Sequence, residues 1–141
     1  MLCFEVYRNG EKLCTAGIGE FGVLTAIVTW VSHEPERLAQ WAASGITETE
    51  PTRLEFTVGG IGRCVGEACE HLKWVEANLA VGDEIRIRVV EVAGADSPSR
   101  RYEDDPAFVE ERRKEYIRTT AKELGWEIST GPDTAQESGS T

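Results

Sequence analysis

The segment from Leu79 to Val92, LAVGDEIRIRVVEV, constrains the fold more than any other part of this sequence. After a turn at Gly82-Asp83, the apolar residues Ile85, Ile87 and Val89 alternate with two arginines. Successive side chains of a strand point to opposite faces of the sheet, so this alternation is typical of a half-buried strand. The segment contains no nucleophile and no general base, and therefore indicates a structural scaffold.

The remaining segments predict an α+β fold, with a mainly antiparallel five-stranded sheet packed with two to three helices. A partly closed barrel or sandwich is the alternative, because strands of this length joined by Gly-rich turns can curl. We expect strands near residues 2–8, 11–17, 22–31, 52–59 and 83–93, and helices covering one side of the sheet near residues 35–44, 67–78 and 106–124.

A hairpin opens the chain, because Asn9-Gly10 suits the positive φ angles of a two-residue type I′ turn. The resulting register pairs Arg8 with Glu11, Val6 with Leu13, and Phe4 with Thr15. We expect Leu2, Phe4, Val6 and Leu13 to share the core face.

Two other segments are assigned by the spacing of their apolar residues. Residues 23–31, VLTAIVTWV, are apolar or β-branched on both faces, which predicts a strand in the centre of the sheet. Ala68, Leu72, Val75 and Leu79 recur at the spacing of one helix face, which predicts the helix over 67–78.

The length of 141 residues fits a single globular domain, expected over residues 1–128, followed by a disordered polar tail over 129–141. The net charge of −10 disfavours nucleic-acid binding, because an acidic surface repels phosphates. No apolar run is long enough to span a membrane, and the N-terminus has no secretory signal pattern. We therefore expect a cytoplasmic protein whose four cysteines are reduced.

Cys64, Cys69 and His71 form the pattern C-x4-C-E-H, which makes them candidate metal ligands. Zinc usually takes four ligands, commonly from two such pairs, and the second pair is missing here. Buried or idle thiols are the alternative interpretation.

The segment Gly60–Gly66, GIGRCVG, follows a predicted strand and precedes a predicted helix, as in a dinucleotide-binding unit. Its glycine spacing differs from the usual pattern, and the fold would need further βα repeats. A flexible turn is the alternative interpretation.

Arg53, Arg86 and Arg88 are predicted on outward faces of strands, where they could receive an anion or an acidic partner. Cross-strand pairing with glutamates is the alternative role. Trp74 lies one position off the predicted helix face, so it is a candidate exposed anchor for a binding partner.

With these segments in place, the motifs GGIG at residues 59–62, HLKW at 71–74 and LAVGDEI at 79–85 are similar to those of small uncharacterised bacterial proteins. The resemblance covers about residues 1–126. It implies a compact domain in the bacterial cytosol, and it implies no activity.

No residues form a recognisable catalytic constellation, so an enzyme is disfavoured and no cofactor is expected. The sequence favours a non-catalytic acidic module that binds another protein, for example an inhibitor or immunity-type protein with a basic partner. The alternative is a small-ligand or metal-binding domain that uses the segment Gly60–His71.

Overall fold

The computed structural model describes residues 1–46 and 50–129. Its elements, in order, are β1 (Leu2–Arg8), β2 (Glu11–Ala16), β3 (Val23–Ser32), α1 (Pro35–Ala43), β4 (Thr52–Val65), β5 (Ala68–Asn78), β6 (Ile85–Glu91), β7 (Arg100–Glu103) and α2 (Pro106–Leu124). The chain divides into two compact units, Met1–Asp104 and Asp105–Thr141, and the predicted domain over 1–128 spans both. Apart from Ser129, the predicted tail lies outside the described residues.

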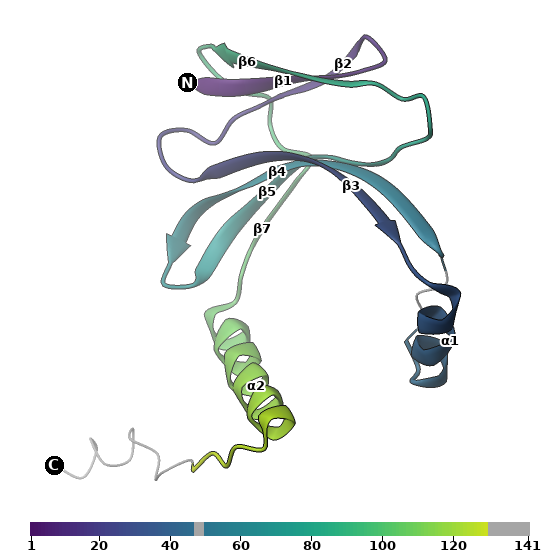
Figure 1. Cartoon of the computed structure of the whole chain (residues 1–141). Helices are drawn as coiled ribbons and strands as arrows, with labels where there is room; N and C mark the ends of the chain where they lie inside the picture. The colour runs from purple at the N-terminus through teal and green to yellow at the C-terminus, as the bar shows by residue number, and fades with distance from the viewer. Residues whose placement is uncertain (47–49, 130–141) are drawn as a thin grey trace, which may run out of the picture. The chain divides into compact units, whose positions relative to one another are not determined.

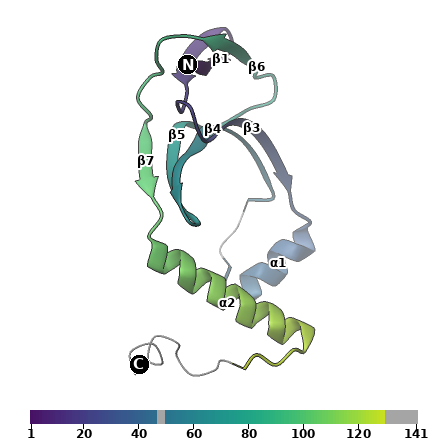
Figure 2. The same cartoon turned by 90° about the vertical axis from the view of Figure 1, so that its left-hand side faces the viewer.

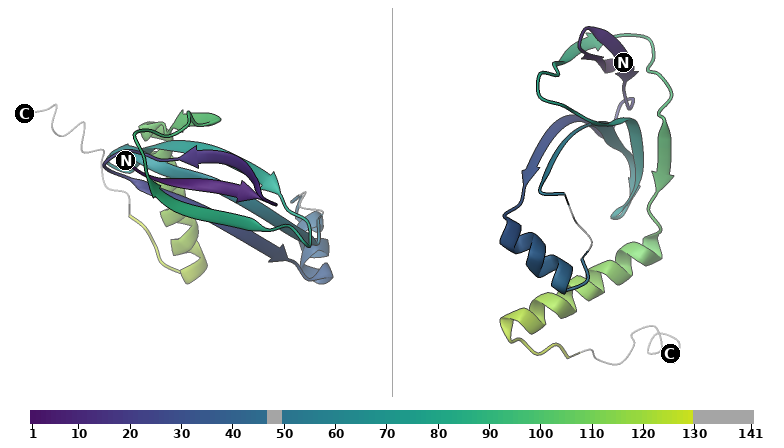
Figure 3. Two further views of the ribbon diagram at one scale, coloured as in Figure 1. Left: turned by 90° about the horizontal axis from the view of Figure 1, so that it is seen from above. Right: turned by 90° about the vertical axis from the view of Figure 1, so that its right-hand side faces the viewer.

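The first unit is built from two antiparallel sheets (Figure 1). One has the strand order β2-β1-β6 and the other the order β3-β4-β5-β7. The α+β class is confirmed, but the predicted five-stranded sheet is wrong, and the described strands do not close into a barrel. The three-stranded sheet covers one face of the four-stranded sheet, where helices were expected (Figure 3).

The β1–β2 hairpin has the predicted turn, with positive φ angles of 52° at Asn9 and 81° at Gly10. Arg8 pairs with Glu11 as expected, but a bulge after Val6 shifts the register. Val6 therefore pairs with Cys14 instead of Leu13, and Phe4 with Ala16 instead of Thr15. As a consequence, Cys14 and Ala16 enter the core, while Leu13 and Leu2 remain exposed.

The predicted helix over 67–78 is wrong, because residues 68–78 of this range form the whole of β5. β4 and β5 make a hairpin around Gly66 and Glu67, with Val65 paired to Ala68. The register shifts after Val58, which changes the phase of inward-facing positions along β5. Because of this shift, the apolar residues of β5 do not alternate strictly, and their spacing resembles that of one face of a helix.

The core of the first unit lies between the two sheets. Each sheet contributes through strands that face the other, and the most deeply buried large side chains include Val6 of β1 and Phe56 and Val58 of β4. The full set of buried residues in this cluster is Val6, Cys14, Ala16, Phe56, Val58, Leu72 and Trp74. Trp74, predicted as an exposed anchor, is only 8% exposed.

Asp96 joins the segment between β6 and β7 to both sheets. Its carboxylate accepts the Thr15 backbone N–H at 2.8 Å, and its own N–H donates to the Thr15 carbonyl at 2.8 Å. Its carbonyl accepts the Trp74 indole N–H at 2.8 Å. The only polar atom of the Trp74 side chain is therefore satisfied inside the core.

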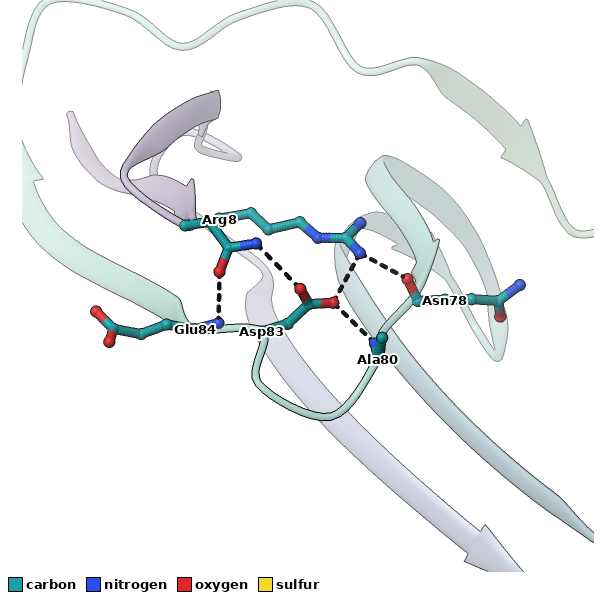
Figure 4. Close-up of polar contacts among 6 residues, drawn as sticks. Arg8, Asn78, Ala80, Asp83 and Glu84 are labelled. Atoms are coloured by element: carbon teal, nitrogen blue, oxygen red, sulfur yellow. Dashed lines mark hydrogen bonds and ion pairs between the residues drawn. The ribbon is translucent and has the colours of Figure 1, made fainter.

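Asp83 makes a second joint, between the β1–β2 turn and the turn leading into β6 (Figure 4). Its carboxylate accepts hydrogen bonds from the Ala80 backbone N–H at 2.8 Å, the Asn9 amide at 3.0 Å and the Arg8 guanidinium at 2.8 Å. Arg8 also donates to the carbonyl of Asn78, the last residue of β5, at 3.1 Å. One carboxylate thus connects the hairpin turn of the three-stranded sheet to the turn that links β5 of the other sheet to β6.

The two helices begin and end close to their predicted positions. α1 starts at Pro35 (Figure 2). None of the residues of α1 is buried. In the second unit, the Asp105 carboxylate accepts the Ala107 N–H at the start of α2, and Gly125 ends the helix in the left-handed conformation. Neither helix combines the length and apolar character needed to cross a membrane.

The Asp83 joint predicts a loss of stability in acid. The hydrogen bond from Ala80, with those from Asn9 and Arg8, lowers the pKa of Asp83 from 3.8 to about 2. Because the folded-state pKa is depressed, its stabilising effect is complete above about pH 4 and is lost as the pH falls toward 2. In urea titrations over this range, the free energy of unfolding should fall more steeply for the wild type than for Asp83→Asn.

Glu91→Gln is the matched control, because the Glu91 carboxylate is exposed and forms no ion pair within residues 1–46 and 50–129. This variant should keep the wild-type pH dependence. An Asp83→Asn variant with the same acid dependence as the wild type would show that the joint does not contribute to stability.

Candidate functional site

The free edge of β3 is the most prominent unpaired element of the first unit. β3 pairs with β4 over ten consecutive positions, from Val23 with Ile61 to Ser32 with Thr52, without a bulge. Within the described part of the chain no strand pairs with its other side, so β3 ends the four-stranded sheet (Figures 2 and 3). Its outward backbone N–H and C=O groups can therefore pair with another extended chain.

The sequence of β3, VLTAIVTWVS, contains no charge, no proline and no glycine. Natural edge strands are usually protected by such residues or by bulges. β3 instead exposes large apolar side chains, with Trp30 73% exposed, Val28 56% and Ile27 49%. This edge has the composition of a strand that is normally paired.

Both faces of the sheet contribute to this apolar edge. Val28 and Trp30 lie on the face that carries the core, opposite Phe56 and Leu54 of β4, respectively. Ile27 lies on the other face, because adjacent residues of a strand point in opposite directions. A strand added at this edge would meet apolar side chains above and below the sheet.

Exposed acidic residues flank the edge at both of its ends. Glu20 lies in the turn before β3, and Glu34 and Glu36 follow the strand at the start of α1. Beyond Ser32, the His33 N–H donates to the Pro51 carbonyl at 2.8 Å, which continues the β3–β4 pairing up to α1. The site therefore consists of an uncharged strand between two acidic ends.

The sequence placed β3 in the centre of the sheet, and this position is wrong. A run that is apolar on both faces is expected for a strand covered on both sides, and an exposed edge strand of the same composition looks identical. The sequence shows that ten consecutive residues carry no charge. It does not show which strands pair with this segment.

The predicted arginine site is divided between the two sheets. Arg86 and Arg88 lie on β6 in the three-stranded sheet, whereas Arg53 lies on β4 in the other sheet. Arg86 stacks on the Tyr7 ring at 4.6 Å, and Arg53 pairs with Glu55 at 3.1 Å. The structure therefore does not bring the three arginines together.

Cys64 and Cys69 face each other across the β4–β5 hairpin and are joined by a disulfide. The expectation of four reduced thiols is therefore wrong for this pair, because the strand pairing brings together two residues that the predicted helix would have separated. Cys3 and Cys14 are free and buried.

His71 lies on the same face of the hairpin as Cys69, two residues along β5. Its Nε2 lies 2.8 Å from Asp104 Oδ2, and its ring stacks on Tyr102 with centroids 4.8 Å apart. The Asp104 carboxylate also accepts the Cys69 N–H at 3.0 Å. These contacts fix the imidazole beside the end of β7.

No group of three or more His, Cys, Asp or Glu side chains in residues 1–46 and 50–129 is arranged to hold a metal ion. In the disulfide form, Cys64 and Cys69 offer no thiolate ligand or nucleophile. Metal binding by Cys64, Cys69 and His71 stays a prediction for the reduced chain.

The segment Gly60–Gly66 does not form a dinucleotide-binding turn. Residues 60–65 continue β4, and Gly66 begins the turn into β5. A pyrophosphate site of that kind needs the N-terminus of a following helix, and a strand follows here.

Comparison with known proteins adds no family assignment, because no family model, no curated protein and no solved structure matches this chain.

The environments of the four cysteines predict the order in which their thiols react with an alkylating reagent. In the native unreduced protein, alkylation should be slow, because Cys3 and Cys14 are buried. Burial, together with the nearby Asp96 carboxylate, also raises the pKa of Cys14 to about 11. Mild reduction without denaturant should release two reactive thiols, Cys64 and Cys69, since Cys64 is exposed. Mass spectrometry after alkylation measures both steps.

The double variant Cys64→Ser/Cys69→Ser is the control and should show no rapidly alkylated thiol before or after mild reduction. Unfolding the reduced wild type should expose all four cysteines. Rapid labelling of Cys3 or Cys14 in the native protein would contradict their buried placement.

Proposed function

We propose that this protein is a non-catalytic, acidic, protein-binding module that adds an extended segment of another polypeptide to the free edge of β3. One observation carries the proposal: a ten-residue uncharged edge strand that exposes Trp30 and Val28. Strand addition obtains affinity from main-chain hydrogen bonds and specificity from side chains on alternate faces. An exposed tryptophan beside that edge is a typical interface anchor.

The charges around β3 indicate the chemistry of the partner. The first unit contains 10 Lys and Arg residues against 17 Asp and Glu residues in positions 1–104, a difference of −7. Acidic side chains at both ends of β3 favour an uncharged or apolar segment bracketed by basic residues. Opposite charges on the two proteins also accelerate their association and suppress acidic competitors.

This partner chemistry supports an inhibitor or immunity-type role toward a basic protein, in the cytoplasm. Strand addition needs no catalytic group, which agrees with the placement of His71 in a structural contact beside a disulfide. The sheet face with Arg86 and Arg88 is the competing interface, and the same experiment tests it.

The proposal is tested by blocking the edge without disturbing the core. A photo-crosslinking residue at position 27 first identifies the partner in a lysate of the source organism. The purified partner is then titrated by calorimetry. Trp30→Ala should weaken the complex by about thirtyfold, the loss expected for an interface hot spot. Val28→Lys should weaken it comparably, because a buried unpaired charge would oppose strand addition.

Hydrogen exchange of the complex should show added protection of amides in β3. The double variant Arg86→Glu/Arg88→Glu is the matched control on the other sheet and should bind like the wild type. Loss of binding in this control, with full binding by Trp30→Ala and Val28→Lys, would assign the interface to the arginine face. Crosslinking only to a second copy of the chain would contradict the proposed partner and show that the β3 edge mediates self-association.

A further inference from the structure

A pocket of about 750 Å³ opens at the end of the two sheets within the first unit. It is lined by the turn between β2 and β3, the adjoining ends of β4 and β5, the segment before β7, and Arg101 of β7. Its volume lies within the range that binds small organic molecules. The pocket lining contains no residue of β3 itself and includes part of the Gly60–His71 segment.

The apolar wall of the pocket includes Ile18, Leu72 and Trp74. Leu72 and Trp74 belong to the core, and Ile18 packs against it. The Trp74 indole N–H is already bonded to the Asp96 carbonyl at 2.8 Å. The ring therefore presents no unsatisfied donor, and this wall fits the apolar body of a ligand.

The two arginines of the pocket differ in their partners. Arg101 pairs with Glu70 at 3.2 Å, so its charge is compensated inside the pocket. Arg63 is exposed and forms no ion pair or hydrogen bond with any described residue. Its guanidinium is free to bind a planar anionic group, for which its geometry is well suited.

The acidic residues of the lining restrict the charge of that ligand. Glu20, Glu70 and Asp96 line the same pocket as Arg63 and Arg101. A polyanion such as a nucleotide would be repelled by the carboxylates of Glu20 and Asp96, whereas the Glu70 carboxylate is already paired with Arg101. A single carboxylate or sulfonate beside Arg63 would gain a partner and leave the rest of the ligand on the apolar wall.

Gly62 keeps the pocket open next to Arg63. A Cβ atom at Gly62 would lie 3.7 Å from the Glu70 carboxylate and 3.9 Å from the Leu72 side chain, both ordinary contact distances. A Cβ atom at this position therefore meets only ordinary contacts, and a larger side chain would extend toward Glu70 and Leu72, which line the pocket.

We propose that this pocket binds a small organic monoanion, with its carboxylate or sulfonate on Arg63 and its apolar body against Trp74, Leu72 and Ile18. This inference does not rest on the proposed function, because it uses neither the strand residues of β3 nor a protein partner. Glu20 alone belongs both to the pocket lining and to an acidic end of the β3 site.

Two fluorescent probes with the same apolar body test the inference on the full chain. Anilinonaphthalene sulfonate carries one negative charge, and phenylnaphthylamine carries none. We expect the sulfonate to bind at a single site. Arg63→Gln should weaken sulfonate binding by about tenfold or more, since hydrogen bonds to charged groups are strong, and should leave phenylnaphthylamine binding unchanged.

Gly62→Leu should weaken the binding of both probes, because it reduces the volume available to the apolar body. Arg88→Gln, which removes a positive charge from β6 outside the pocket, is the matched control and should change neither. Val28→Lys and Trp30→Ala should also leave both probes bound, which separates this result from the test of the β3 edge.

The inference is overturned if the sulfonate does not bind, or if Arg63→Gln and Arg88→Gln weaken it equally. It is also overturned if Gly62→Leu leaves both probes at full affinity, because the probes would then lie elsewhere on the protein. Circular dichroism of each variant verifies that the fold is retained.

Discussion

Two aspartates hold the small sheet against the large one, and the arrangement of the first unit depends on them. Asp96 bonds to β2 through Thr15 and to β5 through the Trp74 indole. Asp83 links the β1–β2 turn to the turn after β5. The three-stranded sheet supplies Val6, Cys14 and Ala16 to the buried cluster, and its partly buried Phe4, Ile85 and Ile87 pack against that cluster. The polar joints supplement this apolar contact. Such joints also fix direction, because hydrogen bonds tolerate little misalignment.

The features that were predicted correctly depend on neighbouring residues. Asn9-Gly10 requires a tight turn whatever surrounds it, and the Asp105 cap and Gly125 stop define α2 within its own sequence. The alternation of Ile85, Ile87 and Val89 with two arginines likewise indicates β6, at Ile85–Glu91. Local chemistry suffices in each of these cases, since no distant contact is needed to select the conformation.

The features that were missed depend on distant pairing. The bulge between β4 and β5 changes the phase of Leu72, Trp74 and Val75, and no residue of β5 alone reveals it. Likewise, the bulge after Val6 exchanges Leu13 for Cys14 in the core. A shift of one position inverts the faces of a strand, so small errors in pairing move whole sets of side chains.

The candidate sites follow the same division. The residue composition of β3 could be read directly, but its position at the sheet edge is a property of topology. The pocket combines Ile18, Arg63, Trp74 and Asp96 from four separate segments, so no motif in the sequence marks it. Conversely, Arg53 shares a residue type and an outward position with Arg86, and yet the two belong to different sheets.

The uniform apolar composition of β3 limits how precisely this strand can fix the register of a second strand paired with it. An incoming strand that slides by two residues keeps the same faces inward and meets similar apolar side chains, so the middle of β3 hardly distinguishes one alignment from the next. Alignment must then be set where the strand is not uniform, at the bulky indole of Trp30 and at the carboxylates of Glu20, Glu34 and Glu36. In the proposed complex, the middle of β3 would supply main-chain hydrogen bonds, and the residues at its ends would set the alignment.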